Sequence, residues 1–381
     1  MNKVLGFILT LGLFACADKS VLEITVANVS ATDRTSEIVE LPLSDITARI
    51  ADEAFVITDK AGRQIPYQKT FDDKVIFPVT ITAGGRGVYT VKRGTPEVYN
   101  VLVFGKHYPE RVDDIAWEND RIAFRTYGPA LQATGEKAYG YDIWVKRVPE
   151  LVVQERYRKE LQDGISYHRD NGNGLDYYKV GPTLGAGTSA LLVDETLVYP
   201  YCYKTFEILD NGPLRFTVKL VYNPLTIKGN DNVVETRLLS LDAGSQLNKV
   251  TISYTNLTEM LPVAAGIVMH DSGKDYVADA VNGYIAYAEP LEEPNGQIFV
   301  GAVFPAGLKD AKPVYLSAGE KRERGADGHL LAIADYQPGT AYTYYFGAGW
   351  NKWGFEDSAV WFDYVKAFAK NLREPLTVSI K

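Results

Sequence analysis

Cysteine, histidine and methionine are scarce in this chain of 381 residues, which contains two Cys, four His and three Met. Cys16 falls at the end of a predicted leader, so Cys202 has no partner and no intramolecular disulfide is expected. The four histidines form no HExxH or similar pair, so a zinc site would need ligands from distant strands. No GxSxG motif marks a serine nucleophile. We therefore expect the hydrophobic core to supply the stability, and we predict no metal or organic cofactor.

The chain also lacks a basic excess. It has 48 acidic and 40 basic residues, a formal net charge of −8, and no long basic run. This balance argues against nucleic acid as a partner. It does not exclude an anionic small substrate, because a local cluster of Arg and Lys binds a carboxylate whatever the net charge is.

Long hydrophobic runs are absent after the first sixteen residues, so no later segment is predicted to span a membrane. The chain begins with Met1-Asn2-Lys3 and a short apolar run that ends at Phe14, followed by Ala15-Cys16. This pattern is typical of a bacterial lipoprotein signal peptide of residues 1–15, with Cys16 as the lipidated residue. We expect an extracytoplasmic protein, anchored only by its lipid to the periplasmic or cell-surface side of the outer membrane. Phe14 is unusual in such signals, and the alternative is secretion with an incidental Cys16.

Aromatic residues, in contrast, are plentiful: the chain has 25 Tyr and 5 Trp. Such a composition is frequent in carbohydrate-active proteins, because flat rings stack on sugar faces and phenols hydrogen-bond to hydroxyls. A β-rich fold favours tyrosine as well.

Short strand-like runs separated by turn residues predict two β domains. The first is a small N-terminal β-sandwich at residues 16–95, with a boundary near Pro96. Residues 96–381 are again mostly β and show no βαβ alternation, which predicts a large antiparallel β-sandwich. One helix is expected late in the chain, capped by Asp357 or Ser358 and ended by Pro375, with a closing strand at residues 376–380.

The densest polar stretch runs from His107 to Arg125. A hairpin turn at residues 117–120 would point Ile122 and Phe124 into the core and Arg125 to the opposite face, from which it can reach a groove. The alternative is a set of surface ion pairs with nearby aspartates.

A second polar stretch, residues 167–178, combines Tyr167 and His168 with carboxylates and flexible glycines. Glycines let the backbone approach a ligand, and histidine titrates near neutrality. Asp170 and Asp176 superficially suggest a calcium loop, but glycine occupies two positions where oxygen ligands are expected. Calcium therefore remains an alternative only.

Further candidates lie at His270 and at residues 350–353, whereas His329 is not one of them. His270 follows an apolar run, so a strand can deliver it to a loop, although a structural histidine is equally compatible with that position. His329 lies in a predicted turn and is expected to be exposed. Trp350 and Trp353 flank Lys352 between glycines; they would stack on a sugar while Lys352 holds an acidic group, or they would anchor the last helix.

Taken together, these motifs resemble the secreted family named domain of unknown function 4861 (DUF4861) over nearly the whole mature chain. The resemblance rests on five stretches: residues 107–129, 140–144, 167–176, 241–246 and 349–354. It implies a sandwich related to the galactose mutarotase and polysaccharide lyase supersandwich. It also implies a role in bacterial glycan utilisation, with oligosaccharide dehydratase activity as one example within the family.

The residues present are compatible with that chemistry. Elimination from a uronate needs a base for the C5 proton, an acid for the departing C4 oxygen and a cation beside the carboxylate. Our candidate bases are His168 and His270, and our candidate acids are Tyr167 and Tyr127. The residues expected to bind the oligosaccharide substrate are Arg125, Lys352, Trp350, Trp117 and Trp144.

Two other function classes stay open. A glycan-binding lipoprotein would use the same rings without chemistry. A mutarotase-like epimerase or glycoside hydrolase would need a carboxylate beside a histidine, for which Glu118 or Asp142 are the candidates.

Overall fold

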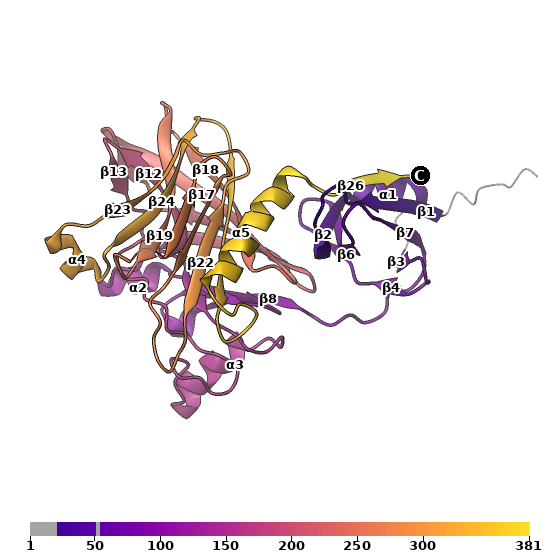
Figure 1. The fold of residues 1–381 in the computed structure, drawn as a ribbon, viewed down its shortest axis with the longest axis horizontal. Coiled ribbons are helices and arrows are strands. Elements are labelled where there is room, and N and C mark those ends of the chain that lie inside the picture. The colour runs from indigo at the N-terminus through magenta and orange to yellow at the C-terminus, as the bar shows by residue number, and fades with distance from the viewer. Residues whose placement is uncertain (1–20, 51–53, 274) are drawn as a thin grey trace, which may run out of the picture.

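The computed structural model describes residues 21–50, 54–273 and 275–381. The predicted signal peptide and Cys16 lie outside these residues. The described chain is mainly β, with several antiparallel sheets and a C-terminal helix, as the sequence predicts. Figure 1 shows a smaller β body, which holds both ends of the described chain, beside a larger one.

Two sheets enclose the core of the smaller body, which we call the small sandwich. One has the strand order β26 (Thr377–Ile380), β1 (Val21–Ala27), β7 (Arg86–Arg93), β3 (Phe55–Asp59), β4 (Gln64–Ile65). The other has the order β2 (Arg34–Pro42), β6 (Lys74–Ile81), β5 (Gln68–Lys69). Helix α1 (Leu43–Ile50) adds Ile46 and Ile50 to the same core.

Strand β26 brings the C-terminus back to the small sandwich, where Ile380 lies opposite Ile24 of β1. The predicted strand at residues 376–380 is thereby confirmed. The predicted division of the chain, with residues 16–95 in one domain and residues 96–381 in the other, does not include this return.

Three sheets build the larger body, which we call the large sandwich. A nine-stranded sheet contains β14 (Tyr203–Asn211), β15 (Arg215–Tyr222), β17 (Asn230–Asp242), β18 (Leu247–Thr255), β25 (Tyr342–Trp350), β22 (Ile298–Val303), β21 (Tyr284–Ala288) and β20 (Tyr276–Asp279), with β16 (Leu225–Ile227) paired to β17. A five-stranded sheet contains β13 (Thr196–Val198), β12 (Ala186–Val193), β19 (Leu261–Met269), β24 (Gly328–Tyr336) and β23 (Asp310–Tyr315). A four-stranded sheet contains β11 (Asp142–Trp144), β10 (Ala123–Thr126), β9 (Asp114–Asn119) and β8 (Val103–Tyr108).

Short helices connect these strands. They are a 3-10 turn (Pro109–Arg111), α2 (Pro129–Thr134), α3 (Val153–Arg158) with a π-helical turn after it (Lys159–Asp163), and α4 (Ala318–Arg324). None of the described helices is long and apolar enough to cross a membrane.

The late helix forms as the sequence predicts. Helix α5 (Ser358–Arg373) is capped by Asp357, whose carboxylate accepts a hydrogen bond from the Val360 N–H. Trp361 is buried against the nine-stranded sheet and donates from Nε1 to the Val300 carbonyl (3.0 Å). In Figure 1 this helix, in yellow, crosses the large sandwich and leads to β26 in the small one.

Strand β17 carries an ion pair into the core. Its buried positions alternate from Val233 to Leu241, and two of them are Glu235 and Arg237. Arg237 donates from Nε to Glu235 (2.6 Å) and from Nη2 to the carbonyl of Ser189 in β12 of the other sheet (3.0 Å). A charged pair thus fills positions where a period-two pattern calls for apolar side chains.

One histidine prediction is wrong. His329 lies within β24 and is buried, not exposed, because its strand is covered by the segment that leads into β12. Its Nε2 accepts the N–H of Leu184 (3.1 Å), and burial lowers the pKa of His329 to about 3. The ring is therefore a neutral structural acceptor.

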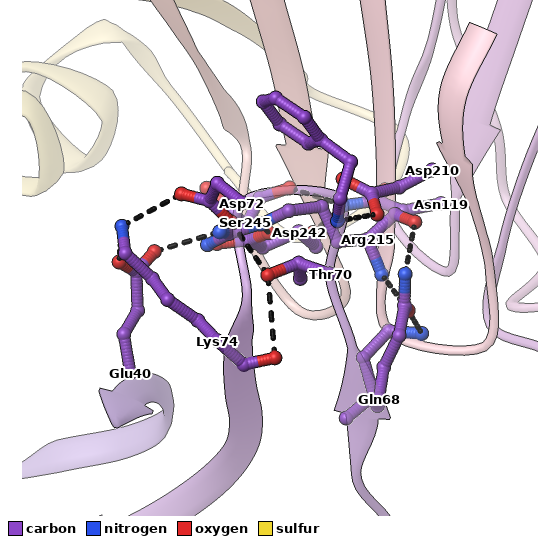
Figure 2. Close-up of polar contacts among 12 residues, drawn as sticks. Glu40, Gln68, Thr70, Asp72, Lys74, Asn119, Asp210, Arg215, Asp242 and Ser245 are labelled. Carbon is purple, nitrogen blue, oxygen red and sulfur yellow. Dashed lines mark hydrogen bonds and ion pairs between the residues drawn. The ribbon is translucent and has the colours of Figure 1, made fainter. Parts of the chain in front are cut away.

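A polar interface joins the two sandwiches (Figure 2). Arg215 of β15 donates to Asp242 (2.5 Å) within its own domain and to Glu40 of β2 (2.7 Å) across the interface. Gln68 of β5 accepts the backbone N–H groups of Leu214 and Arg215, each at 2.8 Å. Hydrogen bonds and ion pairs, not apolar packing, make these contacts between the two sandwiches.

Candidate functional site

Arg125 of β10 lies at the centre of a buried group of carboxylates. It donates to Asp142 of β11 at 2.5 and 2.9 Å and to Asp176 at 2.9 Å, and its Nη1 is 3.5 Å from Asp114 of β9. All four side chains are buried. The guanidinium therefore neutralises internal carboxylates and presents no free charge to a ligand.

Aromatic rings surround this guanidinium. Its carbon lies 5.2 Å from the ring centroids of Tyr127 and Trp144 and 6.0 Å from that of Tyr167. The Tyr167 hydroxyl accepts hydrogen bonds from Nε of Arg111 (2.9 Å) and Nη1 of Arg125 (3.5 Å). We call the carboxylates, the guanidinium and these three rings the Arg125 cluster.

His168 lies at the rim of the Arg125 cluster. Its Nδ1 is 2.9 Å from the Asp176 carbonyl and 3.7 Å from that residue's carboxylate, and 55% of its side chain is exposed. The structure thus brings together five residues proposed from the sequence. They are Arg125, Tyr127, Trp144, Tyr167 and His168.

The charge of the Arg125 cluster is unbalanced. Three carboxylates face one fully enclosed guanidinium, with Arg111 nearby. Burial raises the pKa of Asp114 to about 6, because the charges of Arg125 and Arg111 offset only part of the desolvation cost. Burial and the charge of Asp142 also raise the pKa of Asp176. Asp114 and Asp176 therefore bind their protons more tightly than solvated aspartates do.

Backbone strain accompanies this charge. Val112 and Asp113 are consecutive non-glycine residues in the left-handed region, with φ of 45° and 64°. The turn lets Asp113 accept from His107 and from the Ala130 N–H, each at 3.1 Å, while Asp114 turns toward Arg125. Strain of this kind concentrates at functional sites.

Asp114 yields a prediction about pH. The folded protein keeps a proton on Asp114 up to a pKa of about 6, whereas the unfolded chain releases it near 3.8. This contribution to stability is present below about pH 4 and is lost as the pH rises through 6. As the pH rises from about 4 to about 6, the wild type loses this stability and Asp114→Asn does not. The unfolding free energy of Asp114→Asn is therefore expected to rise by about 3 kcal/mol relative to that of the wild type over this range. Urea unfolding of both proteins across this range measures it, with the exposed Asp363→Asn as control; parallel pH curves for Asp114→Asn and wild type would contradict it.

A second group of residues lies where the two large sheets end. His270 follows β19 and Glu289 follows β21, and His270 Nδ1 is 3.0 and 2.9 Å from the two carboxylate oxygens. The side chains are 15% and 10% exposed, respectively. We call these two residues the His270 pair.

The contact within the His270 pair affects the pKa of both side chains. Burial lowers the pKa of His270, but the hydrogen bond and the negative charge of Glu289 outweigh it, so the pKa is raised above the usual 6.5. Burial raises the pKa of Glu289, and the hydrogen bond and charge of His270 offset part of that rise. A histidine oriented and charged in this way by a carboxylate is a stronger base than a free imidazole.

The segment from Asp176 to Lys179 connects the two groups. Asp176 binds Arg125, and the Tyr178 ring packs edge-on against His270 with centroids 6.0 Å apart. Lys179 extends into solvent with 76% of its side chain exposed, and its Nζ is 3.9 Å from Glu292.

Trp350 ends β25 at the same end of the large sandwich. It lies opposite Ile298, whose carbonyl accepts the Glu289 N–H. Arg147 covers its ring at 5.3 Å and also pairs with Asp170 at 2.9 Å. Lys352 lies 5.8 Å from the same ring and donates to the Pro294 carbonyl.

The model of the family described as "Domain of unknown function (DUF4861)" matches residues 26–378. The chain belongs to the DUF4861 family. "Uncharacterized protein P7" of Formosa agariphila is 28% identical to this DUF4861 chain over 401 residues, which cover 99% of each protein.

Solved structures similar to this DUF4861 chain come from Enterococcus faecalis. A protein in glycosyl hydrolase family 38 superposes with a TM-score of 0.51 at 10% identity, over 96% of this chain and 48% of that one. An alpha-mannosidase from strain V583 gives a TM-score of 0.46 at 9% identity, over 96% of this chain and 47% of the other. The chain spans about half the length of these two proteins, and the first likeness concerns the fold alone.

The three tryptophans proposed to bind substrate are all buried in this DUF4861 chain. Trp117 lies in the core between the rings of Phe124 and Phe216, and its Nε1 donates to Asn248 (2.7 Å). Trp144 and Trp350 are covered by arginines. None of the three rings therefore presents an open face on which a sugar could stack.

The carboxylates proposed for an epimerase or hydrolase are also engaged. Glu118 accepts the backbone N–H groups of Val152 and Val153 and an ion pair from Lys146 (2.7 Å). Asp142 belongs to the Arg125 cluster. Glu118 thus fixes the start of α3 and does not face a ligand.

The glycine-rich loop is closed by the protein itself. Asp170 accepts the N–H groups of Gly172 (2.9 Å) and Gly174 (3.0 Å), and Arg147 takes its other oxygen. Among the described residues, no three His, Cys, Asp or Glu side chains are placed to hold a metal ion.

Sequence reasoning missed Glu289, Asp114, Arg147 and Lys179 as site residues. Asp114 lies within the polar stretch from His107 to Arg125, whereas no motif surrounds the other three. For Glu289 the one available signal was its position directly after a buried strand. A carboxylate there needs a partner, but the sequence does not identify which residue that is.

Proposed function

We propose that this DUF4861 protein acts on uronate-containing oligosaccharides, and that the reaction takes place at the His270 pair. The observation that carries this proposal is the meeting of His270 and Glu289 from two facing sheets, partly open to solvent and bordered by the exposed ammonium of Lys179. The fold likeness to part of a glycosyl hydrolase family 38 protein supports a role with carbohydrate. We also propose that the protein works outside the cytoplasm, held by lipid on Cys16.

The reaction that suits these residues is β-elimination. The C5 proton of a uronate becomes acidic enough to remove when a cation neutralises the adjacent carboxylate. Lys179 and the partly exposed Arg147 are the cations at this end of the sandwich that a substrate carboxylate can reach, and it would share them with Glu292 and Asp170. They take the role that the sequence assigned to Arg125, whose charge is used internally.

His270 is the proton-transfer group in this proposal. In its neutral form it takes the proton from C5, and Glu289 stabilises the resulting imidazolium, as the carboxylate of a catalytic triad does. The C4–O bond then breaks as the C4=C5 double bond forms, and the departing oxygen receives the proton. The products are an unsaturated uronate and either water or a shortened sugar chain.

Substitution of His270 tests this assignment. His270→Gln is expected to lower turnover of oligouronates by about 10²- to 10⁴-fold, the usual contribution of a general acid–base residue. Turnover is followed by the ultraviolet absorbance of the conjugated product and by its mass. Glu289→Gln should also shift the acidic limb of the pH–rate profile to lower pH, because losing the negative charge lowers the pKa of His270.

His107→Gln is the matched control, because His107 also pairs with an aspartate, Asp113, but lies elsewhere. It should keep wild-type turnover. Wild-type turnover by His270→Gln would contradict the assignment. Oligosaccharide that binds to the wild type without any change in mass would instead make the protein a glycan-binding lipoprotein.

A further inference from the structure

A groove of about 540 Å³ separates the small sandwich from the large one. One wall is the start of β2, residues 33–40, and the other combines the turn after β17 with β25 and α5. Its volume falls within the range of ~300–1,000 Å³ that is usual for ligand sites, which favour domain interfaces. The network drawn in Figure 2, with Glu40, Arg215 and Asp242, lies beside it.

Aromatic rings form one side of this interdomain groove. Tyr345 of β25 packs edge-on against Phe368 of α5 at 5.3 Å, and Tyr364 lies 6.3 Å from Phe368. All three are only partly buried. Partly open rings next to hydroxyl and carboxylate groups are the surroundings that a sugar ring requires, because its faces are apolar and its edges polar.

The carboxylates of the groove are already occupied. Glu37 pairs with Arg34 (2.9 Å), Glu40 with Arg215 (2.7 Å) and Lys74 (2.8 Å), and Asp242 with Arg215. Asp33, the remaining acidic lining residue, accepts the Ala83 N–H (2.8 Å).

One cationic group of the groove remains unpaired. Within the described ranges, the ammonium of Lys249 has no ion-pair partner, whereas the guanidinium of the buried Arg34 is held by Glu37. The free polarity of the groove is therefore positive, although the chain as a whole is acidic.

We propose that the interdomain groove is a second binding site for an acidic oligosaccharide, with sugar rings against Tyr345 and Phe368 and an anionic substituent at Lys249. The class of ligand rests on the proposed function. The location rests on the groove itself. Binding there gives the small sandwich a direct role in holding the oligosaccharide.

Calorimetric titration tests the proposal. The probes are disaccharides and octasaccharides of glucuronan, galacturonan and alginate. Lys249→Gln and Thr35→Trp, which fills the exposed rim of the groove, are expected to weaken octasaccharide binding about tenfold, the loss of one charge-assisted contact. Lys204→Gln and Thr196→Trp, on exposed strand positions outside the groove, are the matched controls and should bind as the wild type does. Thermal unfolding of each variant checks that it is folded.

The outcomes separate the two proposals. Octasaccharide binding that depends on Lys249, without turnover by the wild type, keeps the groove and overturns elimination. The binding site in the groove is refuted if turnover depends on His270 while Lys249→Gln, Thr35→Trp and their controls all bind the octasaccharide with equal affinity. Failure of every oligouronate to bind the wild type overturns the groove as well.

Discussion

Arg125→Met is expected to lower the free energy of unfolding by about 3–5 kcal/mol at neutral pH. The substitution keeps most of the side-chain volume but removes the guanidinium that contacts both Asp142 and Asp176. Both carboxylates, with Asp114, would then be enclosed without their main counter-charge. Chemical denaturation, monitored by tryptophan fluorescence, measures the loss.

The pH dependence distinguishes this effect from simple loss of packing. Without the guanidinium the folded-state pKa values of the carboxyl groups rise further, so the variant gains protons and recovers stability as the pH falls. The difference between Arg125→Met and the wild type should therefore shrink toward about pH 5. Arg158→Met serves as control, because Arg158 pairs with Glu155 at the surface and its loss should change little. A loss that is equal at all pH values, or no greater than that of Arg158→Met, would contradict the central role of Arg125.

Arg237→Leu is the second large effect that we expect. Arg237 and Glu235 are both fully buried between the sheets of the large sandwich. Removal of Arg237 leaves Glu235 with the hydroxyl of Ser189 as its remaining hydrogen-bond donor (3.0 Å), and the cost is expected to be about 3–5 kcal/mol. The Tyr222 ring, now 4.3 Å from the guanidinium, would also lose a cation–π contact.

A double-mutant cycle makes this prediction specific. Glu235→Leu combined with Arg237→Leu removes both charges, so most of the lost unfolding free energy should return. If the loss in the double variant equals the sum of the losses in the two single variants, Arg237 does not stabilise the protein through its ion pair with Glu235. Measurement of the four proteins in urea at one pH gives the coupling energy directly.

Local rules account for much of the fold. Helix α5 begins at a capping aspartate and has its apolar stripe against the sheet, because Asp357 satisfies a free N–H and Trp361 and Val365 recur at helical spacing. Strand β26 follows Pro375, which cannot continue a helix. His270 does follow a buried strand, as its apolar lead-in predicts.

Local rules fail where a polar residue is buried. In β17 the period of two is intact, yet Glu235 and Arg237 occupy inward positions, which a binary pattern assigns to apolar residues. His329 sits in a strand rather than a turn, because pairing with β19 and β23 outweighs the turn-forming residues before it. Arg125 lies in a strand as predicted, but the carboxylates that bind it, Asp142 and Asp176, are 17 and 51 residues away in the sequence.

The sequence alone determined the β architecture, the late helix and the family, because these depend on periodicity, capping and short motifs that are properties of neighbouring residues. It also placed Arg125, Tyr127, Trp144, Tyr167 and His168 among the candidates. Only the tertiary structure decided which charges are free. Whether a cation is enclosed among carboxylates, as the guanidinium of Arg125 is, or stays accessible, as the ammonium groups of Lys179 and Lys249 do, depends on which distant carboxylates the fold brings within hydrogen-bond distance. That pairing is a consequence of strand order and sheet packing, which no local pattern encodes.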